Sequence, residues 1–244
     1  MSGDKRLVSS GDVSVSNCGS ASNVAGFVLA GGRSSRMGEE KALVELEGRP
    51  LIAHALDVLR GAGLEPRIAG ARMDLSAFAP VIADEQADRG PLGGVCSALG
   101  QTAEEWAVFV SVDMPLMAPE LVGYLMRDAR LTGAAVTLAA VNGFAETFPA
   151  VVRRETLAAL RERLERGDGG CFAAFEAAAR PEKMRVLAAE VLAQTGQVAD
   201  ARGLWPWQWF LNVNRSEDLE RAAAVGRGNA RGSSVAVVRT AGIE

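Results

Sequence analysis

A glycine pair followed by a lysine comes directly after the first apolar run of the chain. The run 25–29 leads into Ala30, Gly31 and Gly32, and Lys41 follows in the same stretch. Backbone N–H groups exposed by paired glycines beside a helix start form a concave, positive site for phosphate oxygens. The stretch has neither the Gly-Lys-Ser/Thr of a Walker A loop nor the Gly-x-Gly-x-x-Gly of a dinucleotide fingerprint. It predicts a phosphate-binding loop, with a plain tight turn as the alternative.

Lys41 strengthens this interpretation because lysine is rare in the chain. The sequence has three lysines, Lys5, Lys41 and Lys183, against 23 arginines. A compact ammonium on a flexible stem suits a point contact to a triphosphate that changes shape during a reaction. An ordinary surface lysine is the alternative, and composition alone does not reject it.

Asp113 is the second candidate, because it ends the apolar run 108–112 and precedes Met114 and Pro115. In open α/β sheets, ligands gather at the carboxyl ends of the strands, where Asp113 would face the glycine loop. Mg²⁺ is usually held there by one or two carboxylates together with substrate phosphates. The pairing of this aspartate with a glycine loop after another strand favours a metal and nucleotide site over a turn-forming aspartate.

Asp84 is the third candidate. It follows an apolar run at 81–83 and precedes the stretch Gly-Pro-Leu-Gly-Gly at 90–94. Its carboxylate could accept a hydrogen bond from a ribose hydroxyl or a base edge, and the small residues would let a flat ring approach the backbone. A loop with Pro91 near a helix start explains the prolines and glycines, but not the aspartate.

Two asparagines near the end of the chain could face the same site. Asn212 and Asn214 flank Val213 in a run that predicts a strand, so both side chains would point the same way. Asn214 with Glu217 three residues later also fits a variant of the capping box for the next helix. The two roles are compatible.

Three tryptophans, Trp205, Trp207 and Trp209, alternate with other residues just before these asparagines. They could form a stacking surface for a pterin or a docking patch for a partner. Buried packing is the interpretation that we favour, because aromatic side chains dominate core contacts.

The elements that must position these residues alternate between β-branched apolar runs and amphipathic helical patterns. Strands are predicted at the runs 25–30, 66–70, 80–84, 106–112, 134–141, 148–152 and 210–214, and helices at 50–63, 91–102, 119–130, 154–166 and 216–225. Such alternation is typical of βαβ units, and predicts a mostly parallel sheet with helices on both faces. We therefore expect one α/β domain over 24–225. The polar stretches 1–23 and 226–244 are expected to be a disordered arm and a flexible tail, although Val-Ala-Val-Val at 235–238 could add an edge strand.

Composition excludes several classes of function. The 244 residues are 48% hydrophobic with a net charge of −4, so a soluble globular protein is expected, rather than a nucleic-acid binder with its basic surplus. Cys18, Cys96 and Cys171 are widely spaced, which argues against a zinc site or a disulfide framework and suits a reducing compartment. The single histidine, His54, lies on a predicted amphipathic helix, where a structural role is expected. No stretch predicts a membrane span or a secretory signal, so we expect a cytoplasmic protein.

Five stretches, taken in order, resemble a known family. They are LAGGRSSRMGEEKAL at 29–43, EGRPLIAHAL at 47–56, VIAD with GPLGGV and SAL at 81–99, VSVDMP at 110–115 and FLNVNRSEDL at 210–219. Together they resemble the molybdenum cofactor guanylyltransferases, MobA-like NTP transferases with a Rossmann-like α/β fold. The resemblance covers roughly residues 24–225. It implies transfer of GMP from GTP to the phosphate of molybdopterin with release of pyrophosphate, in the presence of Mg²⁺.

The resemblance also implies roles for individual residues. Leu29, Ala30, Gly31 and Gly32 would hold GTP through the backbone, and Arg36 matches the family's loop arginine. Lys41 would contact the phosphates, Asp84 would bind the nucleotide, and Asp113 would bind both Mg²⁺ and GTP. Asn214 is the likelier of the two asparagines for a metal or phosphate role. We expect Arg36, Lys41 and Asp113 to carry the catalysis, in a monomer that meets molybdoenzymes or their chaperones only transiently.

The chain departs from the family pattern in three places. No asparagine is present at 68–70, the stretch 167–171 lacks the basic residue that relatives often have there, and Arg215-Ser216 replaces a common Thr-Pro. These departures leave two alternatives open. One is a transferase that uses CTP or another phosphorylated acceptor, and the other is a nucleotide- or cofactor-binding protein without catalysis.

Overall fold

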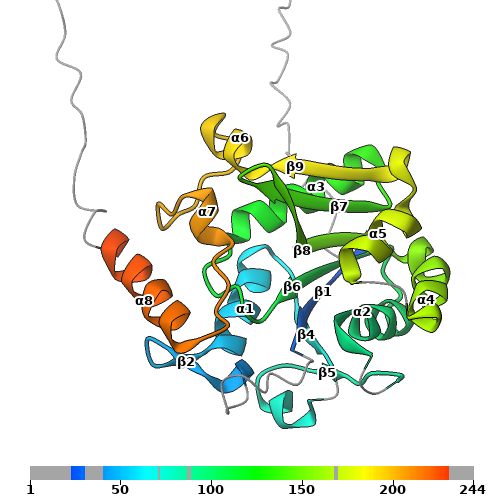
Figure 1. Cartoon of the computed structure of the whole chain (residues 1–244), viewed down its shortest axis with the longest axis horizontal. Coiled ribbons are helices and arrows are strands. Elements are labelled where there is room, and N and C mark those ends of the chain that lie inside the picture. Colours follow the sequence, from blue (N-terminus) through cyan, green and yellow to red (C-terminus); the bar gives the residue numbers. More distant parts are fainter. Residues whose placement is uncertain (1–22, 31–40, 71, 87–88, 168–169, 231–244) are drawn as a thin grey trace, which may run out of the picture.

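The computed structural model describes residues 23–30, 41–70, 72–86, 89–167 and 170–230. Its centre is a seven-stranded sheet in the order β5-β4-β1-β6-β8-β7-β9 (Figure 1). The strands are β1 (Val24–Leu29), β4 (Pro66–Ala69), β5 (Val81–Ile82), β6 (Trp106–Ser111), β7 (Val136–Val141), β8 (Phe144–Arg153) and β9 (Met184–Ala188). Neighbouring strands are parallel except at β8, which runs antiparallel to both β6 and β7. The mostly parallel sheet predicted from the sequence is confirmed.

Helices cover both faces of this sheet, as predicted (Figure 1). One face packs against α1 (Leu51–Gly61), α3 (Pro119–Thr132), α6 (Ala189–Gln194), α7 (Pro206–Trp209) and α8 (Ser216–Ala230). The other packs against α2 (Gly90–Gln101), α4 (Leu157–Arg166) and α5 (Cys171–Ala179). A separate hairpin, β2 (Glu45–Leu46) and β3 (Arg49–Pro50), precedes α1 and lies beside α8.

The central strand β1 shows why the runs around the site are apolar without alternation. Val24 and Val28 belong to the apolar cluster on the α1 face, whereas Ala25, Phe27 and Leu29 belong to the cluster on the α2 face. A parallel strand that is covered on both sides needs apolar residues at successive positions. Every residue of β1 is buried, so its carboxyl end is a fixed platform for the loop that follows.

His54 has the structural role that its helical position predicts. The side chain lies on α1, and its Nε2 atom is 3.1 Å from the carbonyl oxygen of Leu46 in the neighbouring hairpin. This contact ties α1 to β2.

The strand predicted at 210–214 is wrong. These residues form an irregular link between α7 and α8, although the Val213 amide donates to the Asp113 carbonyl oxygen at 2.8 Å. The capping box predicted between Asn214 and Glu217 is also wrong. Instead, the Asp218 carboxylate accepts hydrogen bonds from the amides of Asn214 and Arg215, both at 3.0 Å.

The buried packing predicted for the three tryptophans holds for one of them. Trp209 is 1% exposed and belongs to the core, but Trp205 is 64% and Trp207 52% exposed. The alternating spacing would have suited a strand, whereas Pro206 at the first helical position begins the short helix α7 here.

The C-terminal half contains elements that the sequence did not predict. They are the helices α5, α6 and α7 and the strand β9, and β8 begins four residues earlier than expected, at Phe144. The expected domain boundary at 225 falls inside α8, which continues to Ala230. The arm at 1–22 and the residues 235–238 lie outside the described residues.

Two of the cysteines, Cys96 and Cys171, are buried free thiols, and Cys18 lies outside the described residues. Burial raises the pKa of Cys96 to about 11 and that of Cys171 to about 12. Both side chains therefore stay protonated near neutral pH and act as packing groups. In the described ranges, the helices are too short or too polar to cross a bilayer.

Candidate active site

Three side chains from distant parts of the sequence meet beside the carboxyl end of β6. Lys41 follows the stretch 31–40, Asp113 follows β6, and Asn214 precedes α8. The Lys41 Nζ atom donates to Asp113 Oδ2 at 3.1 Å and to Asn214 Oδ1 at 2.5 Å. The sequence predicted only that these residues face the same site. In the structure, they are joined by direct charged hydrogen bonds.

The two carboxylate oxygens of Asp113 differ, because one has a hydrogen-bond partner and the other has none among the described residues. Its Oδ2 atom pairs with Lys41, and its backbone carbonyl accepts from Val213. Its Oδ1 atom is buried and has no hydrogen-bond partner among the residues that the structure describes. A buried carboxylate oxygen without a partner is costly unless a ligand satisfies it, so Asp113 is suited to receive a cation or a hydrogen-bond donor.

The donor atoms around Asp113 fit a divalent cation that is completed by a substrate. The Asp113 carboxylate and the Asn214 amide supply oxygen atoms, the ligand type that Mg²⁺ prefers. Lys41 Nζ already contacts Asp113 Oδ2 and Asn214 Oδ1, which leaves Asp113 Oδ1 as the oxygen without a partner among the described residues. The described part of the chain contains no cluster of three His, Cys, Asp or Glu side chains that could hold a metal by itself. Phosphate oxygens of a bound nucleotide would have to supply the remaining ligands.

A pocket of about 540 Å³ opens beside Asp113. Its lining comes from the start of α2, the end of β6, the middle of β8 and the start of α5. The lining residues are Arg89, Gly90, Pro91, Leu92, Ser111, Asp113, Met114, Glu146, Thr147, Phe148, Gly170, Cys171 and Asn212. A concave site with a few polar groups on an apolar wall is what a small-molecule site requires.

The wall opposite the charged network is formed by β8 and α5. Phe148 packs edge-on against Phe175, with ring centroids 6.3 Å apart at 88°. Glu146 is the acidic residue on this wall, and partial burial raises its pKa. Cys171 and Gly170 complete the wall at the start of α5.

Arg89 is the cation among the residues that line this pocket. It stands directly before α2, and its guanidinium donates to the carbonyl oxygen of Leu164 near the end of α4. The bond ties the start of α2 to α4, and so fixes Arg89 at the edge of the pocket.

Asp84 lies beside the start of α2 and is not among the residues that line the pocket. A Cβ atom placed on Gly94 would lie 3.7 Å from Asp84 Oδ1 and 3.3 Å from Leu29 Cδ2. The missing side chain at Gly94 therefore keeps space between the Asp84 carboxylate and the end of β1. This geometry agrees with a nucleotide-binding role, which stays a prediction.

The sequence also placed backbone contacts at Leu29, Ala30, Gly31 and Gly32. The amide of Ala30 is already used, because it donates to the Ala69 carbonyl oxygen at 3.2 Å. The Leu29 carbonyl oxygen accepts from the Val112 amide at 3.3 Å. Leu29 and Ala30 thus lie at the base of the loop, and their predicted backbone contacts with GTP stay predictions.

Gly31, Gly32 and Arg36 lie outside the described residues, so their predicted roles stay predictions. The pocket residues that were not singled out from the sequence include Arg89, Glu146 and Phe148. Glu146 carried a weak signal, since it is a charge inside an otherwise apolar strand pattern. Arg89 directly precedes the Gly-Pro-Leu-Gly-Gly stretch, but only the tertiary fold brings it to the pocket.

Known proteins share both the sequence and the architecture. Residues 26–209 match the family described as "MobA-like NTP transferase domain". A probable molybdenum cofactor guanylyltransferase from Opitutus terrae is 40% identical over 175 residues, which cover 69% of this chain and 85% of that protein.

Solved structures show the same fold. Molybdopterin-guanine dinucleotide biosynthesis protein A from Archaeoglobus fulgidus superposes with a TM-score of 0.67 at 21% identity, over 84% of this chain and 99% of its own. A Mycobacterium tuberculosis protein solved in complex with manganese gives a TM-score of 0.58 at 22% identity, over 82% of this chain and 98% of its own. With a family match across most of its length, the chain belongs to the MobA-like NTP transferase family.

Proposed function

We propose that the protein transfers GMP from GTP to the phosphate of molybdopterin, releasing pyrophosphate and forming the guanine dinucleotide of the cofactor. The observation that carries this proposal is the contact of Lys41 with Asp113 at the edge of the pocket, in a chain 40% identical to a probable molybdenum cofactor guanylyltransferase. Lys41 supplies positive charge beside the stretch 31–40, and Asp113 presents a carboxylate oxygen, Oδ1, that has no hydrogen-bond partner among the described residues.

The reaction requires positioning and charge neutralisation rather than a general base. An oxygen of the acceptor phosphate, already ionised at neutral pH, attacks the α-phosphorus of GTP. The bond between the α-phosphorus and the bridging oxygen breaks, and pyrophosphate leaves with the electron pair. Lys41 stabilises the negative charge on the phosphates, and Arg36 and the loop amides are assigned to the same task.

Mg²⁺ is the cofactor that we assign to this site, held by Asp113 with Asn214 and the nucleotide phosphates. When bound, it would draw negative charge from the phosphate oxygens. The manganese complex of a protein with the same fold shows that a divalent cation binds in that relative. Asp113 contributes the carboxylate, and its contact with Val213 keeps the backbone beneath that carboxylate in place.

The two sides of the pocket then hold different substrates. GTP lies on the side of Lys41, Asp113 and Asp84, and the acceptor lies against β8 and the start of α5. The buried free thiols Cys96 and Cys171 suit a reducing compartment, which supports a cytoplasmic location.

A different phosphorylated acceptor is the second candidate function. It is favoured by the stretch 167–171, which lacks the basic residue that relatives often have there, so the phosphate of the acceptor would be held differently. When charged, the Glu146 carboxylate on the same wall would repel any phosphorylated acceptor, although partial burial raises the pKa of Glu146.

The position of the label in GTP tests the proposed reaction. GTP labelled at the α-phosphate should pass its label to molybdopterin, whereas label at the γ-phosphate should appear in pyrophosphate. Label from the γ-phosphate in the acceptor would indicate a kinase and contradict the proposal. The Lys183→Ala variant, changed at a surface lysine 52% exposed and far from the pocket lining, is the control.

A further inference from the structure

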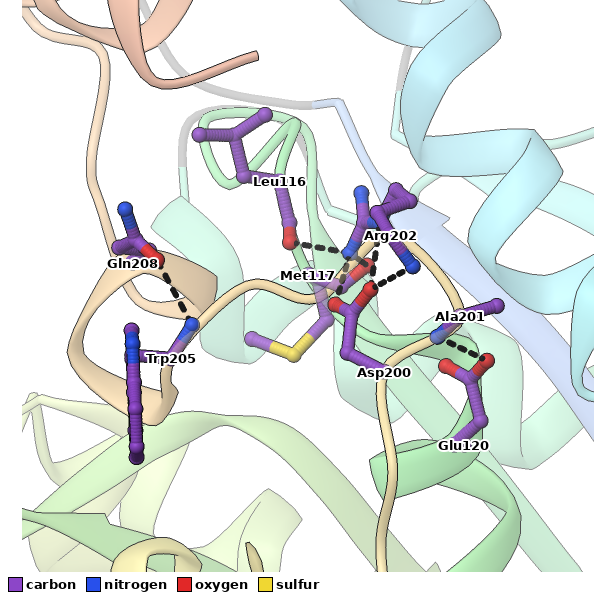
Figure 2. A network of polar contacts seen from close by, with 8 residues as sticks. All are labelled: Leu116, Met117, Glu120, Asp200, Ala201, Arg202, Trp205 and Gln208. Carbon is purple, nitrogen blue, oxygen red and sulfur yellow. Dashed lines mark hydrogen bonds and ion pairs between the residues drawn. The ribbon is translucent and has the colours of Figure 1, made fainter. Parts of the chain in front are cut away.

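The turn that carries Asp113 is held from outside by a short segment between α6 and α7 (Figure 2). The turn runs from 112 to 118 and joins β6 to α3. Leu116 and Met117 within it are buried, and their carbonyl oxygens accept hydrogen bonds from Arg202 Nη2 at 2.8 and 3.2 Å. One guanidinium group therefore satisfies two buried carbonyls of the turn.

Asp200 fixes the position of the Arg202 guanidinium group. The Asp200 side chain is 1% exposed. Its Oδ1 atom accepts from the Arg202 amide at 2.7 Å and from Nε at 3.0 Å, and its Oδ2 atom accepts from Nη2 at 2.6 Å. The carboxylate thus sets both the backbone and the side chain of Arg202, as the dashed lines of Figure 2 show.

The same stretch of chain holds the other end of the turn. The amide of Ala201 donates to Glu120 Oε1 in the first turn of α3 at 3.2 Å, and the amide of Val213 donates to the Asp113 carbonyl at 2.8 Å. Three carbonyl groups of the turn, at residues 113, 116 and 117, are therefore engaged by the segment 200–213.

We propose that Arg202, fixed by Asp200, is a positioning residue that keeps Asp113 ready for the metal and nucleotide. Asp113 lies near the start of the turn that Arg202 holds. Its Oδ1 atom, which has no hydrogen-bond partner among the described residues, must be in position before the substrate arrives. Without Arg202, two buried carbonyls lose their partner and the turn relaxes to find others. This inference rests on the proposed function of the site, because Asp113 is the residue that this function assigns to the metal.

Four variants test the proposal. Arg202→Ala removes the contact, Arg202→Lys keeps the charge but not the planar fork, and Asp200→Asn weakens the grip on the guanidinium. Arg185→Ala is the matched control, because Arg185 makes an equally exposed double contact to Asp128, at 2.7 and 3.0 Å, away from the pocket.

The first measurement is hydrogen exchange of the peptide covering 112–118 in the protein without nucleotide. The amides of Val112, Met114 and Met117 are hydrogen-bonded there. We expect faster exchange in Arg202→Ala and Asp200→Asn, but not in Arg185→Ala. Equal exchange in all variants would overturn the proposal.

The second measurement is Mn²⁺ binding in the presence of α,β-methylene-GTP, followed by the spectroscopic signal of free Mn²⁺. Arg202→Ala should weaken Mn²⁺ binding roughly 10-fold or more, with Arg202→Lys between it and the wild type. Turnover should fall mainly through kcat, with little change in the KM of the acceptor. Unchanged Mn²⁺ affinity in both Arg202 variants would overturn the proposal.

The two measurements separate this inference from the proposed function. If the wild-type protein binds no Mn²⁺ with the analogue, the metal and nucleotide site is wrong. Exchange of 112–118 still decides whether Arg202 holds the turn. If Arg202→Ala fails to fold, Asp200→Asn and Arg202→Lys provide the same comparison with smaller changes.

Discussion

The two sides of the pocket, which we assign to the nucleotide and to the acceptor, are held together by different kinds of contact. On the nucleotide side, Lys41, Asp113 and Asn214 are joined by charged hydrogen bonds from three separate parts of the chain. On the acceptor side, the wall is a strand and a helix start, packed through Phe148 and Phe175, and Glu146 is its acidic group among the described residues. The contrast suggests that chemistry belongs to the first side and selection of the acceptor to the second.

The contrast makes Asp113 the residue with the largest expected effect. Asp113→Asn keeps the shape but removes the charge, so kcat should fall on the order of 100- to 1,000-fold, as when a preorganised electrostatic contact is lost. The melting temperature should fall only slightly, because asparagine keeps an oxygen that can accept from Lys41 Nζ, and the charge of one partly exposed ion pair is lost. Steady-state kinetics and thermal unfolding check both parts, and near wild-type turnover in the folded variant would remove Asp113 from the site.

Lys41 should show the next largest effect, and on one substrate only. Lys41→Ala loses a charged hydrogen-bonded contact, so the KM of GTP should rise about 10- to 150-fold, equivalent to roughly 1.5 to 3 kcal/mol. The KM of the acceptor should stay close to that of the wild type. Kinetics with each substrate varied in turn measure this, with Lys183→Ala as the control. A similar rise for both substrates would break the division between the two sides.

Glu146 tests the acceptor side through pH. Burial raises its pKa above the ordinary 4.5, so folding disfavours the charged form. Below pH 4.5 the side chain is protonated in both the folded and the unfolded chain, and the penalty is absent. As the pH rises through the raised pKa, the folded protein loses stability relative to Glu146→Gln.

We therefore expect a small rise in the melting temperature of Glu146→Gln at neutral pH and none in acid. The KM of a phosphorylated acceptor should also fall in this variant, because a negative charge leaves the wall, while the KM of GTP stays the same. Thermal unfolding across pH and two-substrate kinetics are the measurements. An unchanged acceptor KM would place the acceptor elsewhere.

The exposed tryptophans should give the smallest effect. Trp207 is 52% exposed and is not among the residues that line the pocket, so Trp207→Ala should leave both KM values and the melting temperature nearly unchanged. A clear rise in the acceptor KM would show that the acceptor site reaches α7, and would support stacking of a pterin on Trp207.

The sequence predicted the nucleotide side better than the acceptor side, and the reason is local. Lys41 and Asp113 follow strongly apolar strands, so their position at one edge of the sheet follows from the topology of parallel strands. Asn214 was placed correctly near the site but on a strand that does not form, because the chain there is held by contacts with Asp113 and Asp218.

The acceptor wall left no comparable signal. Its strand β8 is antiparallel to its neighbours. The helix α5 follows a glycine-rich stretch, and its apolar residues have no strong helical periodicity. The role of Arg202 could not be predicted from the sequence either, since it depends on the carbonyl groups of Leu116 and Met117, which are distant along the chain. Contacts between side chains and distant backbone groups are fixed by tertiary packing, and periodicity does not record them.

Pyrophosphate release from each of the four nucleoside triphosphates, with and without molybdopterin, tests the account most directly. We predict rapid release from GTP only when both molybdopterin and Mg²⁺ are present, and its loss in Asp113→Asn. Release that ignores molybdopterin, or that is fastest with CTP, would contradict the proposed guanylyl transfer.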